Sequence, residues 1–249
     1  MDNATVWVIA GLAVVLGVTL QRLSGMGTGL VLAPTLSALF GGAVGVLMSN
    51  VAAIASAGLI LWAVRDRVAW RRGATLVGFA VPGAVLGALF VLVVPAAWLT
   101  IIVGVVVLVA LGNSYLRPHL RERHGLAVTA VAGGVGGLFN TTAGVAGPAM
   151  MLYARTTRWE QREFAATLQL VFLGMNILSV ILKNLIGIGA SALPPLWVAP
   201  GMLVLVVCGI GIGSLLEKRV SIPAARRTAE VLALVGSVVA IARGVLALT

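Results

Sequence analysis

The sequence predicts an all-α integral membrane protein with about 8–10 transmembrane segments, arranged as two inverted five-segment repeats. Three observations support this class. Of the 249 residues, 60% are hydrophobic and only 10% are charged, whereas a soluble domain carries about 25% charged residues. The mean hydropathy is +1.11, and long apolar segments recur along the whole chain. The basic residues are confined mainly to a few short connections between those segments.

Ten apolar segments account for most of the chain. Most of them reach the roughly 20 residues that a helix needs to cross the hydrocarbon core of a bilayer. The pairs 5–21/24–40 and 125–138/140–154 are shorter and broken by glycine, so we expect the first two segments of each repeat to be short or re-entrant. The segments lie at 5–21, 24–40, 43–63, 73–94, 97–116, 125–138, 140–154, 164–186, 196–216 and 228–248.

The placement of charge predicts the orientation in the membrane. All but three of the 17 Lys and Arg residues lie in four connections. Basic connections stay on the cytoplasmic side of a membrane, so we expect these four inside and both termini outside. Their basic residues are Arg65, Arg67, Arg71 and Arg72; Arg117, Arg121 and Arg123; Arg155, Arg158 and Arg162; and Lys218, Arg219, Arg226 and Arg227.

The two halves of the chain resemble each other with opposite orientation. Pro34, Pro82-Gly83 and Pro95-Ala-Ala97 recur as Pro148, Pro200-Gly201 and Pro223-Ala-Ala225. The basic connection of the first half then aligns with a neutral one in the second half, and the reverse also holds. Inverted repeats of this kind belong to secondary transporters, whose substrate site lies near the midplane where broken helices meet. We assign 1–116 to the first repeat, 117–124 to a cytoplasmic basic linker and 125–249 to the second, inverted repeat.

A Gly-rich stretch with small polar side chains occurs in the first pair of segments of each half. The stretches are Gly25-Met-Gly-Thr-Gly29 and Asn140-Thr-Thr-Ala-Gly144, and each leads into an apolar helix with one proline. Hydroxyls, amides and free N–H groups at such a helix start favour a small anion. The alternative is close helix packing of the GxxxG kind. The substrate-binding residues predicted here are Gly25, Gly27, Thr28, Gly29, Asn140, Thr141, Thr142 and Gly144.

Polar residues inside the apolar segments are further candidates for substrate binding. They are costly in lipid and often mark a transport pathway. Ser49 and Asn50 lie in the third segment, and Gln169 and Asn176 lie in its counterpart in the second half. Asn50 and Gln169 hold comparable places in the two halves. Interhelical hydrogen bonding is the alternative role for each of the four.

Three cations fall outside the basic connections, namely Arg22, Lys183 and Arg243. Arg22 stands beside the first Gly-rich stretch, and we predict it to be a fixed counter-charge to a bound anion. Lys183 and Arg243 lie near the outer ends of long segments. We expect both of these side chains to snorkel to the membrane interface.

The sequence carries no signature of catalysis or of metal binding. No carboxylate lies well inside an apolar segment, so an acidic proton relay of the kind common in pumps is not expected. Metal-ligand clusters, a Walker loop and a nucleophile elbow are all missing. We therefore predict no catalytic residue, no metal and no cofactor. The expected partners are a small anionic substrate and the lipid bilayer, without nucleic acid; a homodimer stays open.

Four motifs in a fixed order suggest a family. They are Gly25 to Pro34, Ser49 to Ile54, Pro82 to Leu89 after a basic connection with Trp70, and Gly136 to Pro148. In this order they resemble the TauE/SafE sulfite and organosulfonate exporters over essentially the whole chain. The last motif departs from the family pattern, since Ala143, Val145 and Ala146 interrupt its glycine run. The resemblance implies export of a small sulfur-containing anion across the cytoplasmic (inner) membrane of a prokaryote.

We therefore expect a secondary transporter that exports sulfite, a sulfonate or a related organosulfur compound by alternating access. The residue pattern by itself indicates a small-anion carrier with a central site. The alternatives are a carrier for another small organic anion, such as a carboxylate, and a non-transporting membrane subunit. A membrane-embedded enzyme is disfavoured, because the sequence offers neither an acidic metal-binding pair nor a nucleophile–base set.

Overall fold

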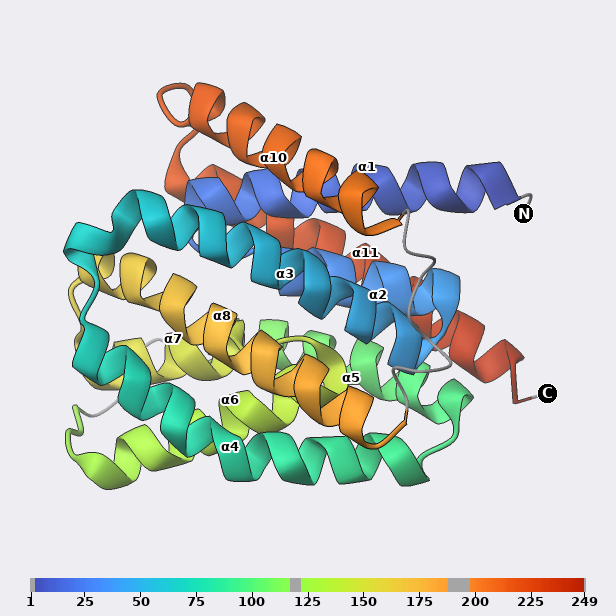
Figure 1. Cartoon of the computed structure of the whole chain (residues 1–249), viewed down its shortest axis with the longest axis horizontal. Helices are drawn as coiled ribbons and strands as arrows, with labels where there is room; N and C mark the ends of the chain where they lie inside the picture. Colours follow the sequence, from blue (N-terminus) through green and yellow to red (C-terminus); the bar gives the residue numbers. More distant parts are fainter. Residues whose placement is uncertain (1–2, 117–121, 188–197, 249) are drawn as a thin grey trace.

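The computed structural model describes residues 3–116, 122–187 and 198–248, and these ranges form helices without a strand (Figure 1). The ten apolar segments predicted from the sequence each correspond to one α-helix. The elements are α1 (Asn3–Ser24), α2 (Thr28–Phe40), α3 (Gly42–Val64), η1 (Arg65–Arg67), α4 (Trp70–Val93), α5 (Ala96–Leu116), α6 (Leu126–Ala143), α7 (Gly147–Thr156), α8 (Gln161–Leu185), α10 (Val198–Leu216) and α11 (Ile222–Leu246).

The first pair of helices in each half consists of a long helix and a short one. α1 has 22 residues and α6 has 18, and both meet the length and hydropathy of a membrane span. α2 has 13 residues and α7 has 10, which gives lengths of about 20 Å and 15 Å. The first helix of each pair is longer than the sequence predicted because helical structure continues through the polar residues up to Ser24 and Ala143.

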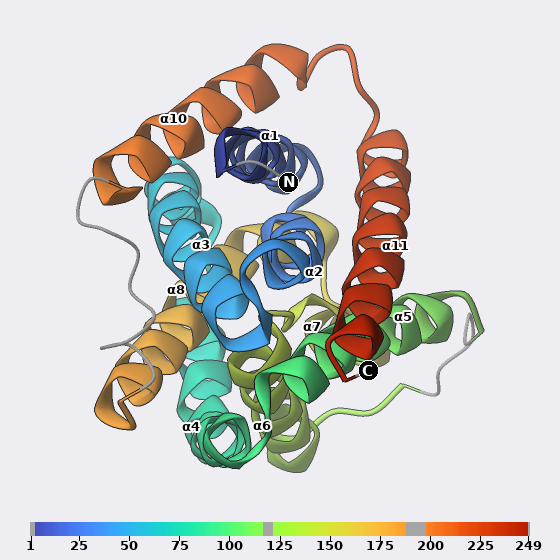
Figure 2. The ribbon, with the colours of Figure 1, turned by 90° about the vertical axis from the view of Figure 1, so that its right-hand side faces the viewer.

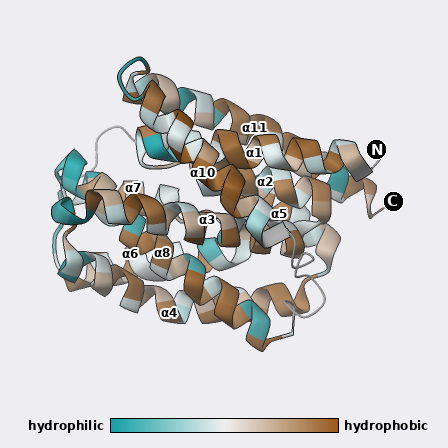
Figure 3. Ribbon diagram, turned by 45° about the horizontal axis from the view of Figure 1, so that its top comes forward, coloured by the Kyte–Doolittle hydropathy of each residue, from teal (hydrophilic) through white to brown (hydrophobic). Residues whose placement is uncertain are grey.

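The chain is a multi-pass membrane protein. Six helices of the described ranges are long and apolar enough to cross a bilayer. Large apolar side chains are exposed along the outer faces of α4, α10 and α11, among them Leu86, Leu203 and Val235. In a soluble protein such faces would be unfavourable, but in a bilayer they meet lipid. Figure 3 shows hydrophobic residues along the helices and hydrophilic ones gathered mainly at one end.

The basic connections lie together at one end of the helix bundle, here called the basic end. The α3–α4, α7–α8 and α10–α11 connections and the start of α6 all lie on the left in Figure 1. Both termini and the α2–α3 and α4–α5 connections lie at the opposite end, here called the terminal end. Arg117 and Arg121 are outside the described residues. This separation of charge is the arrangement that the predicted topology requires, while the side of the membrane that each end faces remains a prediction.

The short helix α2 occupies the middle of the bundle. Seen end-on, it lies among α1, α3, α5 and α11, all of which pack against it (Figure 2). Its side chains from Leu30 to Pro34 are buried, as are Leu36, Ser37 and Ala38. In the first half α1 packs extensively on α10, and in the second half α6 packs extensively on α4. These pairings are what two inverted repeats would produce, and the repeat with its boundaries at 116 and 125 stays a prediction.

Glycines set the distance between α4 and α6, so close small-residue packing is part of this fold. A Cβ atom on Gly83 of α4 would overlap the carbonyl oxygen of Gly134, and one on Gly137 of α6 would overlap that of Ala80. Gly133 and Gly137 form the small-xxx-small spacing that lets helix backbones approach in membranes. Helix packing of the GxxxG kind, which was the alternative for the two Gly-rich stretches, therefore occurs at the crossing of α4 and α6.

Substitution of Gly83 by alanine should lower the thermal stability of the protein in detergent. The added methyl group meets backbone atoms that have no free rotamer to move away, which costs about 1–3 kcal/mol. Gly78→Ala on the same helix is the matched control, because nothing lies within 4 Å of its Cβ position, and alanine there should be neutral or stabilise by about 0.5–1 kcal/mol. Equal melting temperatures for the two variants would show that the α4–α6 crossing is looser than described.

Candidate functional site

The two Gly-rich turns end α1 and α6 in the same way. Gly25 (φ +78°) follows α1, and Gly144 (φ +71°) follows α6. The N–H of Gly25 donates to the carbonyl of Gln21 at 2.8 Å, and the N–H of Gly144 donates to the carbonyl of Asn140 at 2.9 Å. Positive φ is the region that glycine occupies without steric cost. The residue numbers of these glycines differ by 119, whereas those of Pro34 and Pro148 differ by 114. Because both glycines end a helix with the same geometry, they are better reference positions than the prolines for aligning the two halves.

The two turns touch each other through their backbones. A Cβ atom on Gly29 would overlap the carbonyl oxygen of Gly144. A Cβ atom on Gly144 would in turn lie 2.9 Å from the Cβ of Ala33. No side chain fits at either glycine, so the contact between the two halves depends on both residues.

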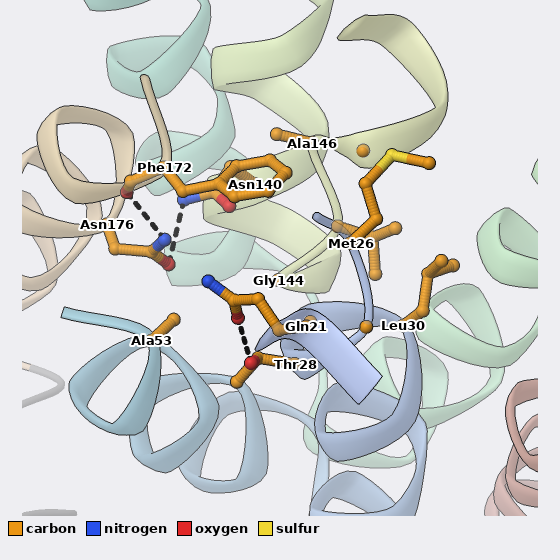
Figure 4. Close-up of a pocket in the computed structure, with 14 residues that line it drawn as sticks. Gln21, Met26, Thr28, Leu30, Ala53, Asn140, Gly144, Ala146, Phe172 and Asn176 are labelled. Carbon is orange, nitrogen blue, oxygen red and sulfur yellow. Dashed lines mark hydrogen bonds between the residues drawn. The ribbon is translucent and has the colours of Figure 1, made fainter. Parts of the chain in front are cut away.

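A small cavity lies between the two turns (Figure 4). Its volume of about 20 Å³ is enough for roughly one water molecule. Several lining residues come in pairs whose numbers also differ by 119, such as Gln21 with Asn140 and Ala53 with Phe172. The lining residues are Gln21, Met26, Gly27, Thr28, Gly29, Leu30, Ala53, Asn140, Gly144, Val145, Ala146, Gly147, Phe172 and Asn176.

Two helix N-termini converge on this cavity. Gly27 to Gly29 begin α2, Ala146 and Gly147 begin α7, and neither helix has a side-chain cap. The first N–H groups of a helix have no partner within the helix and carry the positive end of its dipole. By contrast, α8 is capped by Glu160, which accepts from the N–H groups of Arg162 and Glu163, and these bonds lower the pKa of that carboxyl. The N-termini of α3, α4 and α6 also have no side-chain cap, so what distinguishes α2 and α7 is that both begin at the same cavity.

Gln21 is the centre of a hydrogen-bond network on one side of the cavity. Its Oε1 accepts from the hydroxyl of Thr28, and also from that of Ser56 at 3.4 Å. Its Nε2 donates to Oε1 of Gln169 at 2.8 Å. Nε2 of Gln169 donates to the carbonyl of Gly25 at 3.3 Å, so the network holds the first turn against α8.

Asparagines form the corresponding network on the other side. Nδ2 of Asn140 donates to Oδ1 of Asn176 at 3.3 Å, and Nδ2 of Asn176 donates to the carbonyl of Phe172 at 2.7 Å. Asn50 donates to the hydroxyl of Ser179, and its Oδ1 lies 3.6 Å from the Cβ position of Gly144. Asn50 thus stands beside the second turn much as Gln169 stands beside the first.

Comparison with known proteins decides the family. A family model described as Sulfite exporter TauE/SafE matches residues 9–242, nearly the whole chain. The chain belongs to the TauE/SafE family. It is thus a membrane transporter rather than an enzyme. No curated protein and no solved structure matches the chain significantly.

The structure brings most of the predicted binding residues of this TauE/SafE member to the cavity or to its turns. Gly25, Asn50 and Gln169 contact the turns without lining the cavity. Thr142 donates to the carbonyl of Leu138 in its own helix. The hydroxyls of Ser49 and Thr141 are buried and have no hydrogen-bond partner in the described part of the chain. The predicted residues that line the cavity are Gly27, Thr28, Gly29, Asn140, Gly144 and Asn176.

Arg22 lies away from the cavity, against α10. Its guanidinium forms an ion pair with Glu217 at 2.9 Å and donates to the hydroxyl of Ser214 at 3.2 Å. The reason is that α1 continues to Ser24, and neighbouring residues of a helix point about 100° apart. Gln21 therefore faces the cavity while Arg22 faces α10, and the geometry gives Arg22 a structural partner instead of an open counter-charge role.

Eight of the lining residues were not predicted from the sequence, and Gln21 and Phe172 are the largest polar and the largest apolar side chain among them. The other six are Met26, Leu30, Ala53, Val145, Ala146 and Gly147. Gln21 is a polar residue in an apolar run, and its number differs from that of Asn140 by 119. An alignment of the two halves on their turn glycines, in place of their prolines, would have identified it. Phe172 carries no such signal, because an aromatic residue in an apolar segment is the expected core residue.

Gln21 and Gln169 should be energetically coupled. Gln21→Leu leaves the Thr28 hydroxyl and the Gln169 carbonyl oxygen without their partner, and an unsatisfied buried group costs about 1–3 kcal/mol. The double variant Gln21→Leu/Gln169→Leu avoids part of that penalty. Its loss of stability should therefore be smaller than the sum of the two single losses, by about 1 kcal/mol or more. Thermal unfolding of the four proteins in detergent measures this. The pair Gln21→Leu and Gln161→Leu, with Gln161 exposed on α8, is the additive control, and additivity of both pairs would contradict the network.

Proposed function

We propose that this transporter exports sulfite or a small organosulfonate by alternating access, with the cavity between the two turns as its substrate site. The observation that supports this most strongly is the convergence of two uncapped helix N-termini on one buried cavity. Family membership supplies the substrate class, since the matching model describes sulfite exporters.

The chemistry of the cavity suits a sulfur oxyanion. Such an ion needs several N–H or O–H donors to replace its water, and free N–H groups at helix ends provide them without a fixed charge. The amides of Gln21 and Asn140 and the hydroxyl of Thr28 are within the same lining. Met26, Leu30 and Phe172 form the apolar part of the wall, which suits the methylene groups of an organosulfonate.

The small volume of the cavity favours a cycle in which the two halves move apart around it. It holds about one water molecule, and a sulfite ion is larger, so binding requires the turns to separate. The α1–α2 hairpin comes from the terminal end and the α6–α7 hairpin from the basic end (Figure 1). Movement of one hairpin against the other would open the cavity to either end in turn. With the basic end in the cytoplasm, export runs from the basic end to the terminal end.

A ligand-stabilisation panel on the purified protein tests the proposed substrate. The panel contains sulfite, thiosulfate, sulfoacetate, taurine, sulfate and acetate at matched ionic strength, because a ligand that binds only the folded state raises the melting temperature. We expect sulfite or a sulfonate to stabilise the protein selectively, and the same anion to move across proteoliposome membranes. Stabilisation and flux with acetate alone would assign the carrier to carboxylates, and no response to any anion would contradict the proposed site.

Thr28→Val and Asn140→Ala should weaken binding of the stabilising anion while the protein remains folded. A hydrogen bond to a charged group contributes about 1.5–3 kcal/mol, so each loss should raise Kd roughly tenfold to a hundredfold. Calorimetric titration measures the effect. Thr100→Val and Asn184→Ala are matched controls, because those side chains hydrogen-bond only to carbonyls of their own helices in the described structure. Unchanged affinity in both site variants would contradict the central-site proposal.

A further inference from the structure

Lys183 on α8 is fully buried, which corrects the expectation that it snorkels to the membrane interface. Its exposed fraction is 0%, and its Nζ has no hydrogen-bond partner within the described ranges. Burying an ammonium group without a partner is among the most unfavourable arrangements in a protein. An ionisable side chain held inside a membrane protein in this way marks a functional position.

Lys183 belongs to a polar stripe on the inner face of α8. Gln169, Asn176 and Lys183 follow one another at intervals of seven residues, with Ser179 between the last two. Residues at this spacing lie on one face of a helix. The other three residues of the stripe all bond to helices inside the bundle. Gln169 bonds to Gln21 of α1, Asn176 to Asn140 of α6, and Ser179 to Asn50 of α3. The face that carries Lys183 therefore points into the bundle.

The stripe leads from the cavity toward the terminal end. α8 begins at the basic end and runs to the terminal end (Figure 1). Asn176 lines the cavity, and Lys183 follows it by two helical turns, or about 10 Å along the axis. Asn50 of α3 bonds to Ser179, which lies between Asn176 and Lys183 on this face, and its Oδ1 has no partner in the described structure. Polar groups of α3 and α8 therefore lie between the cavity and the level of Lys183.

No acidic side chain of the described residues lies at this level of the bundle. Asp66, Glu122, Glu160 and Glu217 are at the basic end, in or beside the connections. Glu163, on the same helix as Lys183, is 20 residues before it, or about 30 Å along the axis. Glu230 is eight residues into α11, which begins at the basic end, and it pairs with Arg226 at 3.3 Å. The described carboxylates therefore give Lys183 no negative partner.

We propose that Lys183 is a second anion-binding residue, on the exit side of the central cavity, which receives the substrate as it leaves the two turns. This inference rests on the proposed function and adds the charge that the cavity itself lacks. A cation on one side of the cavity only would also make the substrate path through the protein asymmetric. The positions of α3 that match Asn176, Ser179 and Lys183 by the difference of 119 are Ala57, Ile60 and Val64, which are all apolar, so the basic side of the cavity has no equivalent cation on that helix.

Flux measurements in proteoliposomes, with sulfoacetate as the probe, test the role of Lys183. Lys183→Met should slow the flux at least tenfold and should leave the Kd of the central cavity within about threefold of the wild type. Lys183→Arg, which keeps the positive charge, should restore part of the flux. Lys218→Met is the matched control, because Lys218 is the other lysine of the chain and is exposed at the basic end. Removing an unpaired buried cation should not destabilise the protein, so loss of flux will not reflect misfolding.

Amine labelling gives a readout that does not depend on transport. A small water-soluble acylating reagent, followed by mass spectrometry, reports on Lys183 and Lys218 in the same sample; the buried Lys183 reacts only while the bundle is open, so its labelling is followed over time. We expect sulfoacetate to reduce the labelling of Lys183 severalfold and to leave that of Lys218 unchanged. If the wild type transports no sulfur anion but another anion protects Lys183 from labelling, the proposed substrate is wrong, whereas the role of Lys183 in anion binding is supported. Wild-type flux in Lys183→Met, or absence of protection by every anion tested, would overturn the assignment of Lys183.

Discussion

The backbone contact between Gly29 and Gly144 is the constraint on which the rest of the structure depends. It joins the start of α2 to the turn after α6, and neither residue has space for a side chain. Because the two turns meet this closely, the N-termini of α2 and α7 face the same small cavity. The same contact fixes the positions of Gln21 and Asn140, whose carbonyls receive the N–H groups of the turn glycines. Backbone geometry thus sets the site before any side-chain chemistry acts in it.

Polar groups inside this bundle have to find partners in the protein, since lipid offers none. Gln21, Gln169, Asn140 and Asn176 do so by bonding across helices from different parts of the chain. The networks therefore serve two purposes, because they hold the closed state together and they are the groups that a bound anion would recruit. In the proposed cycle, opening the cavity would exchange these bonds for bonds to the substrate. Because of this exchange, the free energy needed to open the cavity would be low only when a suitable ligand is present.

The sequence predicted the class of fold, the helices and several of the residues that line the cavity, and its errors have identifiable causes. Apolar length and basic connections depend on composition, so the ten segments and the gathering of basic residues at one end could be read directly. The two Gly-rich stretches stood out because glycine and small polar residues are unusual in apolar segments. Side-chain direction could not be read in the same way: Gln21 and Arg22 are neighbours, and only helix packing shows that one faces the cavity and the other Glu217. The burial of Lys183 was missed because its distance from the end of α8 suggested the interface, while the packing around α8 encloses it.

The central position of α2 has a consequence for how the protein is made. This helix leaves the ribosome early, yet it packs against α11, which lies about 190 residues later in the chain. The backbone of Thr35 and the ring of Pro34 lie beside Gly236 of α11, so the surroundings of α2 are complete only after α11 has been made. Until then a short helix with polar neighbours such as Gln21 and Thr28 must be held at the membrane without its final contacts. Assembly of the core is therefore a late event, in which the second half of the chain closes around a hairpin inserted by the first.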